Sequence, residues 1–200
     1  MDGRRSFAGE DEASGTAYWV TGLPGVGRKT LARALAARLT DIGGSVVHLD
    51  GDRMREILGD RFGHGQADRH VLSLAYGRLC REVAGQGHDV VFATVSMFHD
   101  VRRWNRASIP NYREIYLRAS PALLAQRHPK GLYAAAQAGR IRNVVGFDLP
   151  MEEPETADIV IDVDTGTTPQ SVLDQTLRRL GLIAPPTGAL SSQDGAPAAA

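Results

Sequence analysis

The feature that most constrains the fold is a glycine-rich turn, residues 22–30, between an apolar run and a helix-forming run. The apolar run, residues 17–21, is typical of a short buried strand. The run after the turn, residues 31–39, contains strong helix formers with leucines four residues apart. A glycine loop between a strand and a helix is the context of a phosphate-binding loop. Glycines let backbone N–H groups converge on a polyphosphate, and the helix N-terminus adds its positive dipole.

The loop departs from the usual pattern G-x-x-x-x-G-K-[ST] at its last two positions. Arg28 takes the place of the lysine, and Lys29 takes the place of the hydroxyl residue that ligates Mg²⁺. Arginine keeps the charge but has a bulkier, planar head group, and Lys29 cannot ligate a metal. In one alternative the loop is one residue longer, so that Lys29 and Thr30 serve as the lysine–hydroxyl pair. In another, the loop keeps the fold but has lost ordinary ATP chemistry. We expect phosphate binding by the loop residues Gly22, Gly25, Gly27, Arg28, Lys29 and Thr30.

Strand and helix patterns alternate along the rest of the chain. Further strands are predicted at residues 45–49, 89–95, 112–117 and 158–162, and helices at 53–58, 67–85, 101–108, 121–126 and 169–180. This alternation predicts an α/β fold, a P-loop NTPase-like parallel sheet with helices on both faces. Ligands bind such sheets at the carboxyl ends of the strands, where the glycine loop, Asp50, Asp52 and Ser96 are expected.

Length and composition limit the remaining options. The 200 residues fit one kinase-like domain at 17–183, between a disordered leader (1–16) and a disordered tail (184–200). Lys+Arg and Asp+Glu balance at 23 each, so no overall field favours nucleic acid or an anionic membrane. The single Cys80 suits helix packing better than a catalytic role. It also suits a reducing compartment, and no apolar run is long enough to span a membrane, so a cytoplasmic location is expected.

Charged residues outside the loop supply further candidates. Asp50 and Asp52 follow a strand directly, where one carboxylate can hold Mg²⁺ and the other can accept a proton from a hydroxyl. The alternative is a turn in which Asp52 caps the next helix. Arg55 and Arg69 suit an anionic substrate, and the basic stretch 127–142 suits a lid, although each also suits a solvated surface. His48, inside a strand, is expected in the core.

These stretches together resemble the adenylyl-sulfate kinase family, whose members phosphorylate the ribose 3′-hydroxyl of adenylyl sulfate with ATP and Mg²⁺. The resemblance rests on residues 22–27, 49–52 with Arg55, 68–69, 129–133 and 153–155. It implies Asp52 and Asp50 as catalytic residues, with Asp50 as a metal ligand. The longer-loop alternative adds Lys29 as a catalytic residue and Thr30 as a metal ligand. The resemblance implies substrate contacts from Arg55, His64, Arg69, Ser96, Lys130, Leu132 and Val144.

Two departures qualify the substrate. The family holds the substrate adenine between two phenylalanines, and the corresponding positions here are His64 and Val144. A branch that resembles the chain better, the cytidine diphosphoramidate kinases, shares 63–64, 105–106 and 143–146. The resemblance thus implies an ATP-dependent kinase for a small nucleotide, cytidine diphosphoramidate-like or adenylyl sulfate, with a homodimer as one option. The alternatives are a catalytically impaired nucleotide-binding relative and a transferase with a donor other than ATP.

Overall fold

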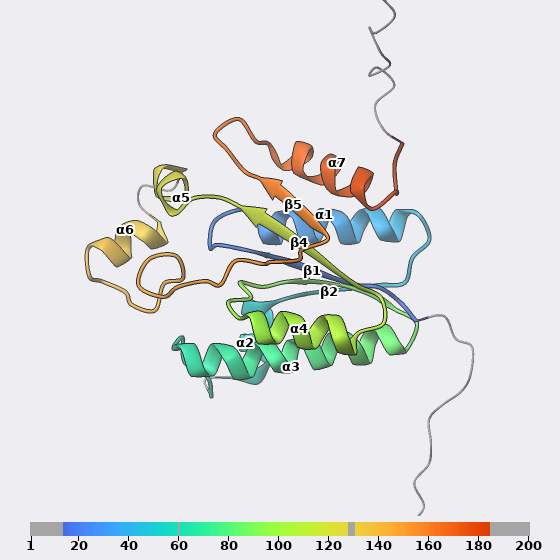
Figure 1. Cartoon of the computed structure of the whole chain (residues 1–200), viewed down its shortest axis with the longest axis horizontal. Coiled ribbons are helices and arrows are strands. Elements are labelled where there is room, and N and C mark those ends of the chain that lie inside the picture. The colour runs from blue at the N-terminus through green and yellow to red at the C-terminus, as the bar shows by residue number, and fades with distance from the viewer. Residues whose placement is uncertain (1–13, 60, 128–130, 185–200) are drawn as a thin grey trace, which may run out of the picture.

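A parallel sheet lies between two layers of helices (Figure 1) in the computed structural model, which describes residues 14–59, 61–127 and 131–184. The strands are β1 (Ala17–Gly22), β2 (Val46–Asp50), β3 (Asp89–Ala93), β4 (Tyr112–Arg118) and β5 (Ile159–Asp162). Their order is β2-β3-β1-β4-β5, and each neighbouring pair runs parallel. The predicted α/β fold with a parallel sheet is confirmed.

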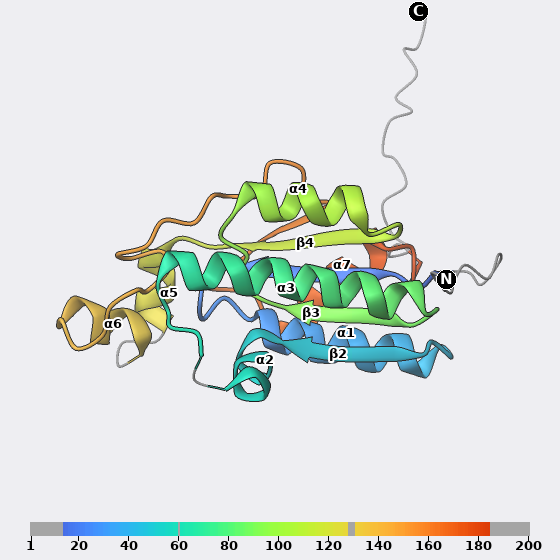
Figure 2. The ribbon, with the colours of Figure 1, turned by 90° about the horizontal axis from the view of Figure 1, so that it is seen from below.

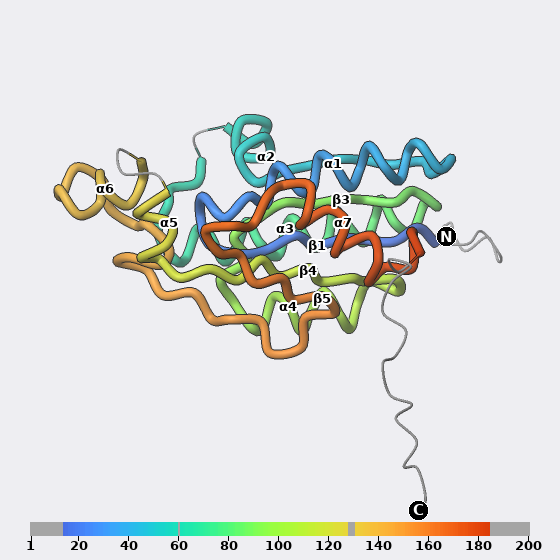
Figure 3. The backbone as a smooth tube through the Cα atoms, turned by 90° about the horizontal axis from the view of Figure 1, so that it is seen from above, coloured from blue at the N-terminus to red at the C-terminus, as the bar shows by residue number. Residues whose placement is uncertain are grey.

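The helices cover both faces of the sheet and the carboxyl ends of its strands. They are α1 (Arg28–Asp41), α2 (Gly51–Leu58), α3 (Gln66–Gly85), α4 (His99–Ser108), α5 (Pro121–Arg127), α6 (Leu132–Gln137) and α7 (Pro169–Arg179). Helices α1 and α7 pack on one face, and α3 and α4 on the other (Figure 2). Helices α5 and α6 lie beyond the carboxyl ends of the strands, at the end of the molecule opposite residues 14 and 184 (Figure 3).

Strand β1 is the centre of the core because every one of its residues is buried. Tyr18 and Val20 face the hydrophobic cluster that contains Leu35 of α1, whereas Trp19 faces the cluster that contains Leu72 of α3. This alternation follows from the two-residue period of a strand. It fixes the end of β1, and with it the glycine loop, between the helical layers.

Strand β2 is an edge strand, and its position corrects one expectation. His48 is exposed rather than buried, so its placement in the core was wrong. An edge strand has a neighbour on one side only, and a sequence pattern does not show which strands lie at the edges.

Two other segments differ from the expectation in extent. Residues 132–137, expected as part of a basic lid, form the short helix α6. Residues 14–16, assigned to the leader, bond to the body: the Gly15 N–H donates to the Ala84 carbonyl at 2.8 Å, and the Thr16 N–H to Asp89 Oδ1 at 2.7 Å. Among the helices described, none is long and apolar enough to cross a membrane.

Candidate active site

The glycine loop connects the end of β1 to the start of α1. Gly22, Gly25 and Gly27 have φ values of 145°, 86° and 108°, conformations that glycine adopts without steric cost. A Cβ at Gly22 would also lie 2.5 Å from the Leu117 carbonyl oxygen, so this position has no room for a side chain. The sequence places glycine where the turn between β1 and α1 requires it.

The three residues after Gly27 open helix α1, and their side chains point in different directions. Gly27 is the N-cap, so Arg28, Lys29 and Thr30 are the first, second and third helical residues. Successive residues of a helix are rotated by about 100°. Arg28 faces a cavity together with Arg55 and others, and Lys29 contacts carboxylates. Thr30 borders a cavity beside the start of α7, and it shares another with Arg28 and Lys29.

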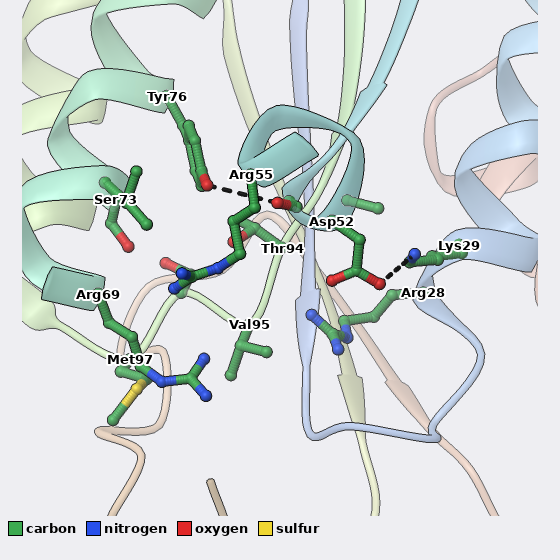
Figure 4. A pocket seen from close by; sticks show the side chains of 14 residues that line it. Arg28, Lys29, Asp52, Arg55, Arg69, Ser73, Tyr76, Thr94, Val95 and Met97 are labelled. Atoms are coloured by element: carbon green, nitrogen blue, oxygen red, sulfur yellow. Dashed lines mark hydrogen bonds and ion pairs between the residues drawn. The ribbon is translucent and has the colours of Figure 1, made fainter. Parts of the chain in front are cut away.

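Asp50 and Asp52, at the end of β2 and the start of α2, both contact Lys29. The Lys29 ammonium lies 2.5 Å from Asp52 Oδ2 (Figure 4) and 3.3 Å from Asp50 Oδ1. Asp50 Oδ1 also accepts hydrogen bonds from the N–H groups of Asp52 and Arg53, at 2.9 and 3.0 Å. Asp50 therefore caps α2, which corrects the alternative in which Asp52 did so.

The pKa values favour the ionised form of this pair. Desolvation acts to lower the pKa of Lys29, but the hydrogen bond and charge of Asp52, with Asp50, outweigh it and raise the pKa. Desolvation acts to raise the pKa of Asp50, but the backbone N–H of Arg53, the Lys29 charge and the other hydrogen bonds outweigh it and lower the pKa. Lysine and carboxylate are both charged at neutral pH, so the ion pair persists there.

The residues expected to hold Mg²⁺ do not fit that ion. Mg²⁺ at nucleotide sites relies on one or two carboxylate or hydroxyl ligands besides the phosphates. Here the position of the hydroxyl residue is occupied by Lys29, and its ammonium lies against both carboxylates. Within the described residues, no group of three or more His, Cys, Asp or Glu side chains is placed to hold a metal ion.

A cavity of about 100 Å³ lies between the loop, α2, α3 and the end of β3 (Figure 4). The guanidinium groups of Arg28, Arg55 and Arg69 and the carboxylate of Asp52 all border it. Burial lowers the pKa of Arg69, and the charge of Arg55 lowers it further. Like charges held together at a half-buried site favour an anionic ligand.

Backbone carbonyls hold the side chains of Arg55 and Arg69 in place. Arg55 Nη1 donates to the carbonyls of Phe62 and Gly63, at 3.1 and 2.8 Å. Arg69 Nε donates to the His64 carbonyl at 2.7 Å, and its Nη2 to the Asn143 carbonyl at 3.0 Å. The arginines therefore also fix the segments that surround the cavity.

Ser96 follows β3 and borders the same cavity, as expected. It is 2% exposed with φ of 39°, a conformation that is uncommon for residues other than glycine. Its carbonyl accepts a hydrogen bond from Arg102 Nη1 at 2.6 Å, and its hydroxyl has no partner among the described residues. A strained residue with an unpartnered hydroxyl at a cavity wall is typical of a functional site.

The other predicted substrate residues separate into three groups. His64 and Leu132 border a cavity of about 530 Å³ that the loop, Asp52 and both arginines share. Val144 is 3% exposed and packs in the hydrophobic core, so its side chain is not available to a ligand. Lys130 lies outside the described residues.

Several cavity residues were not predicted from the sequence. A cavity of about 290 Å³ on the other side of the loop is bordered by Gly25, Gly27, Thr30, Arg127, Val163, Thr167, Thr168 and Pro169, among others. Thr168 caps α7: its Oγ1 accepts a hydrogen bond from the Ser171 N–H at 3.1 Å. A threonine before the proline of the last predicted helix was an available signal, since this turn lies at the carboxyl end of the sheet. Ser73 and Tyr76, on α3, were also missed.

Cys80 is fully buried in the cluster on the α3 face, and burial raises the pKa of its thiol well above the ordinary value. A thiol with a raised pKa is a poor nucleophile. The packing role expected for Cys80 agrees with this placement.

Comparison with known proteins identifies relatives over most of the chain. Residues 14–162 match the family described as Adenylylsulphate kinase. The Cytidine diphosphoramidate kinase of Campylobacter jejuni is 35% identical over 164 residues, 82% of this chain and 95% of that protein. The Probable bifunctional SAT/APS kinase 2 of Sorangium cellulosum is 36% identical over 188 residues, 93% of this chain but only 32% of that protein.

A solved structure agrees with these matches. The APS kinase CysC of Mycobacterium tuberculosis, in complex with AMPPNP and APS, superposes with a TM-score of 0.76 at 26% identity. The match covers 85% of this chain and 99% of that one. From the family match over residues 14–162 and these relatives, the chain belongs to the adenylylsulphate kinase family.

Proposed function

We propose that this protein transfers a phosphoryl group from ATP to the ribose 3′-hydroxyl of a small nucleotide with an anionic substituent. One observation carries the proposal: a carboxylate, Asp52, and the guanidinium groups of Arg55 and Arg69 border one cavity that also reaches Arg28 of the glycine loop. Phosphoryl transfer is catalysed mainly by positioning and by charge stabilisation, and this cavity offers groups for both.

The donor nucleotide fits the loop and the cavity beside α7. Backbone N–H groups of a glycine loop and a helix N-terminus bind phosphates, and Arg28 adds a charge there. The cavity beside Thr30 is bordered by apolar Leu117, Val163 and Val172, which suit a nucleoside. The complex of the Mycobacterium relative with AMPPNP supports a nucleotide donor.

The acceptor fits the cavity on the opposite side of Arg28. Arg55 and Arg69 can bind the acceptor's anionic groups, and the Asp52 carboxylate can accept a hydrogen bond from the ribose hydroxyl and orient it. A hydroxyl oriented in this way can attack the γ-phosphorus of ATP held at Arg28. The bond from that phosphorus to the β–γ bridging oxygen then breaks and ADP leaves, while the hydroxyl proton passes to Asp52 or to solvent. The steps assigned to this chain are therefore binding, alignment and proton acceptance.

A cytidine derivative fits the acceptor cavity better than adenylyl sulfate. Val144 is in the core and His64 is exposed, so these positions do not supply two aromatic faces for an adenine. The Campylobacter relative named Cytidine diphosphoramidate kinase, 35% identical, supports this choice.

The test is a kinase assay with ATP and each acceptor, cytidine diphosphoramidate and adenylyl sulfate, with products identified by mass spectrometry. We expect a 3′-phosphorylated product and a higher kcat/KM for the cytidine nucleotide. Arg69→Ala should lower kcat/KM for the acceptor about tenfold or more, because a charge-assisted contact is lost, and should leave ATP affinity unchanged. Arg61→Ala, at an exposed arginine, is the matched control. ATP binding without any product would instead favour the binding-only alternative.

A further inference from the structure

We propose that Lys29 takes the place of a divalent cation at the Asp50 and Asp52 carboxylates, so that this site binds its nucleotide without Mg²⁺. The inference rests on the proposed function, because it concerns the nucleotide that the glycine loop would hold. It assigns separate tasks to the two adjacent cations of the loop: Arg28 faces the phosphates, and Lys29 neutralises the carboxylates.

The geometry of Lys29 carries the first step. Its ammonium is 2.5 Å from Asp52 and 3.3 Å from Asp50, within ion-pair distance of both carboxylates. These residues come from separate elements, since Lys29 is the second residue of α1, Asp50 ends β2, and Asp52 is the second residue of α2. The ammonium therefore joins the glycine loop to the carboxylates after β2, as a bridging cation would.

The surroundings of the carboxylates carry the second step. Asp50 Oδ1 already accepts two backbone N–H groups and contacts the ammonium, so this oxygen has little capacity for a further cation. Lys29 is half-exposed, with 53% of its side chain accessible, and its ammonium lies within ion-pair distance of both carboxylates. A metal ion would have to displace it or bind beside a like charge, and both are unfavourable.

The register of α1 carries the third step. A hydroxyl at position 29 would be available to a metal ion, but Lys29 stands there, and Thr30 is rotated about 100° further around the helix. Thr30 borders the cavity beside α7 and also, with Lys29 and Asp52, the cavity of about 530 Å³. The remaining hydroxyl therefore stands one residue later than the motif places it, and the motif position holds an ammonium instead.

Arg28 supplies the remaining charge for the phosphates. It is half-buried and, among the described residues, makes no ion pair, although Asp52 lies close enough to influence its pKa. Burial lowers the pKa of Arg28 to about 10, so the group is still a cation at neutral pH. The phosphates of the nucleotide would contact the guanidinium of Arg28, while Lys29 already neutralises the carboxylates of Asp50 and Asp52.

The experiment is isothermal titration of the full-length protein with ADP and with ATP, once with excess Mg²⁺ and once with EDTA. We expect the wild-type Kd in EDTA to lie within about threefold of the Kd in Mg²⁺. Lys29→Thr restores the hydroxyl and frees the carboxylates, so it should bind ADP about tenfold or more tightly in Mg²⁺ than in EDTA. Lys29→Ser should behave in the same way and serves as the second variant.

Arg53→Thr is the matched control. Arg53 is a cation in the first turn of α2, next to Asp52. Its side chain pairs with the exposed Glu56 and not with the carboxylates of Asp50 and Asp52. This variant should keep the metal independence of the wild type, and circular dichroism melts should show that every variant is folded.

The outcomes separate the inference from the proposed function. Wild-type binding that weakens tenfold or more in EDTA would overturn the inference and leave the proposed function standing. A folded Lys29→Thr variant that gains no metal dependence would also overturn it. If the folded wild type binds neither ADP nor ATP under both conditions, the inference and the proposed function fail together.

Discussion

At the scale of single residues, two neighbouring cations form different contacts because successive residues of a helix point in different directions. Arg28 and Lys29 are adjacent in sequence and border the same cavity, yet among the described residues only Lys29 forms ion pairs with the carboxylates. The sequence motif alone predicts the same role for both residues, that of a positive charge near a phosphate. The helix start at Arg28 separates them.

A second residue-scale feature is the buried carboxylate of Glu114 in β4. The residue is 1% exposed, and its carboxylate lies 3.7 Å from Arg102 Nε and 3.8 Å from Arg106 Nη2. Burial raises the pKa of Glu114 to about 7, although both arginine charges oppose the rise. The folded protein therefore holds a proton on Glu114 at pH values where the unfolded chain, with a pKa of 4.5, has lost it.

We predict that this proton makes stability fall as the pH rises. Where the folded state binds more protons, the free energy of unfolding decreases with pH. The contribution of Glu114 is complete below about pH 4.5 and is lost by about pH 7, a change of about 3 kcal/mol. Urea unfolding at pH 5, 6, 7 and 8 measures this slope, and Glu114→Gln should flatten it.

The comparison of wild type with variant isolates Glu114 from other groups. Partial desolvation lowers the pKa values of the exposed residues His48 and His64, so these histidines add stability as the pH rises and partly mask the slope of the wild type. Both remain in the variant, as they do in Glu56→Gln, a control at an exposed glutamate. Equal slopes for wild type and Glu114→Gln would contradict the prediction.

At the scale of elements, the glycine loop depends on two glycines for different reasons. At Gly22, φ is positive and a Cβ would also meet the Leu117 carbonyl at 2.5 Å and the Val26 side chain at 2.9 Å. At Gly27, φ is positive but no atom lies within 4 Å of the Cβ position. The first glycine is required by space and conformation, and the second by conformation alone.

We predict that Gly22→Ala is more damaging than Gly27→Ala. The strained φ alone should cost about 1–2 kcal/mol of unfolding free energy at Gly27, and the backbone contact should add to it at Gly22. Urea unfolding measures the difference, and titration with ADP shows whether the deformed turn still binds phosphate. Gly139→Ala, at a positive φ with open space far along the chain, is the control for conformational strain alone. Equal losses at Gly22 and Gly27 would show that the contact with Leu117 relaxes freely.

The elements were largely predictable from sequence because their patterns are local. The strands at 17–22 and 112–118 and the helices at 28–41 and 66–85 were expected within a few residues of their observed bounds. Each combines an apolar period with clear end signals. The exposure of His48 was not predictable, because it depends on the order of strands in the sheet.

The site was predictable in part, and the features that were missed depend on local backbone conformation and burial. The loop, Asp50, Asp52, Arg55 and Arg69 meet at one edge of the sheet, as the rule for parallel sheets implies. The use of Asp50 as a cap depends on the backbone conformation of a single turn, which the residue pattern does not encode. Val144 was mistaken for a ligand contact because apolar residues of the core and of a pocket look alike in sequence.

At the scale of the whole molecule, charge is balanced overall but not at the site. The chain carries 23 basic and 23 acidic residues, whereas the cavities beside the loop bring together Arg28, Lys29, Arg55 and Arg69 against Asp50 and Asp52. A local positive field in a neutral protein attracts small anions without general affinity for polyanions. The protein should therefore bind nucleotides but not DNA.

We predict that nucleotide binding weakens with salt although the net charge is zero. Raising KCl from about 50 mM to about 500 mM shortens the screening length to about a third, and the Kd for ADP should rise about three- to tenfold. Arg28→Gln removes one cation that faces the phosphates, so its Kd should be higher at low salt and its salt dependence shallower. Arg53→Thr, whose arginine pairs with Glu56, should follow the wild-type curve. A Kd that does not change with KCl would mean that backbone N–H groups bind the phosphates and that the arginines contribute little. The reason is that salt screens dipolar contacts at close range far less than it screens separated charges.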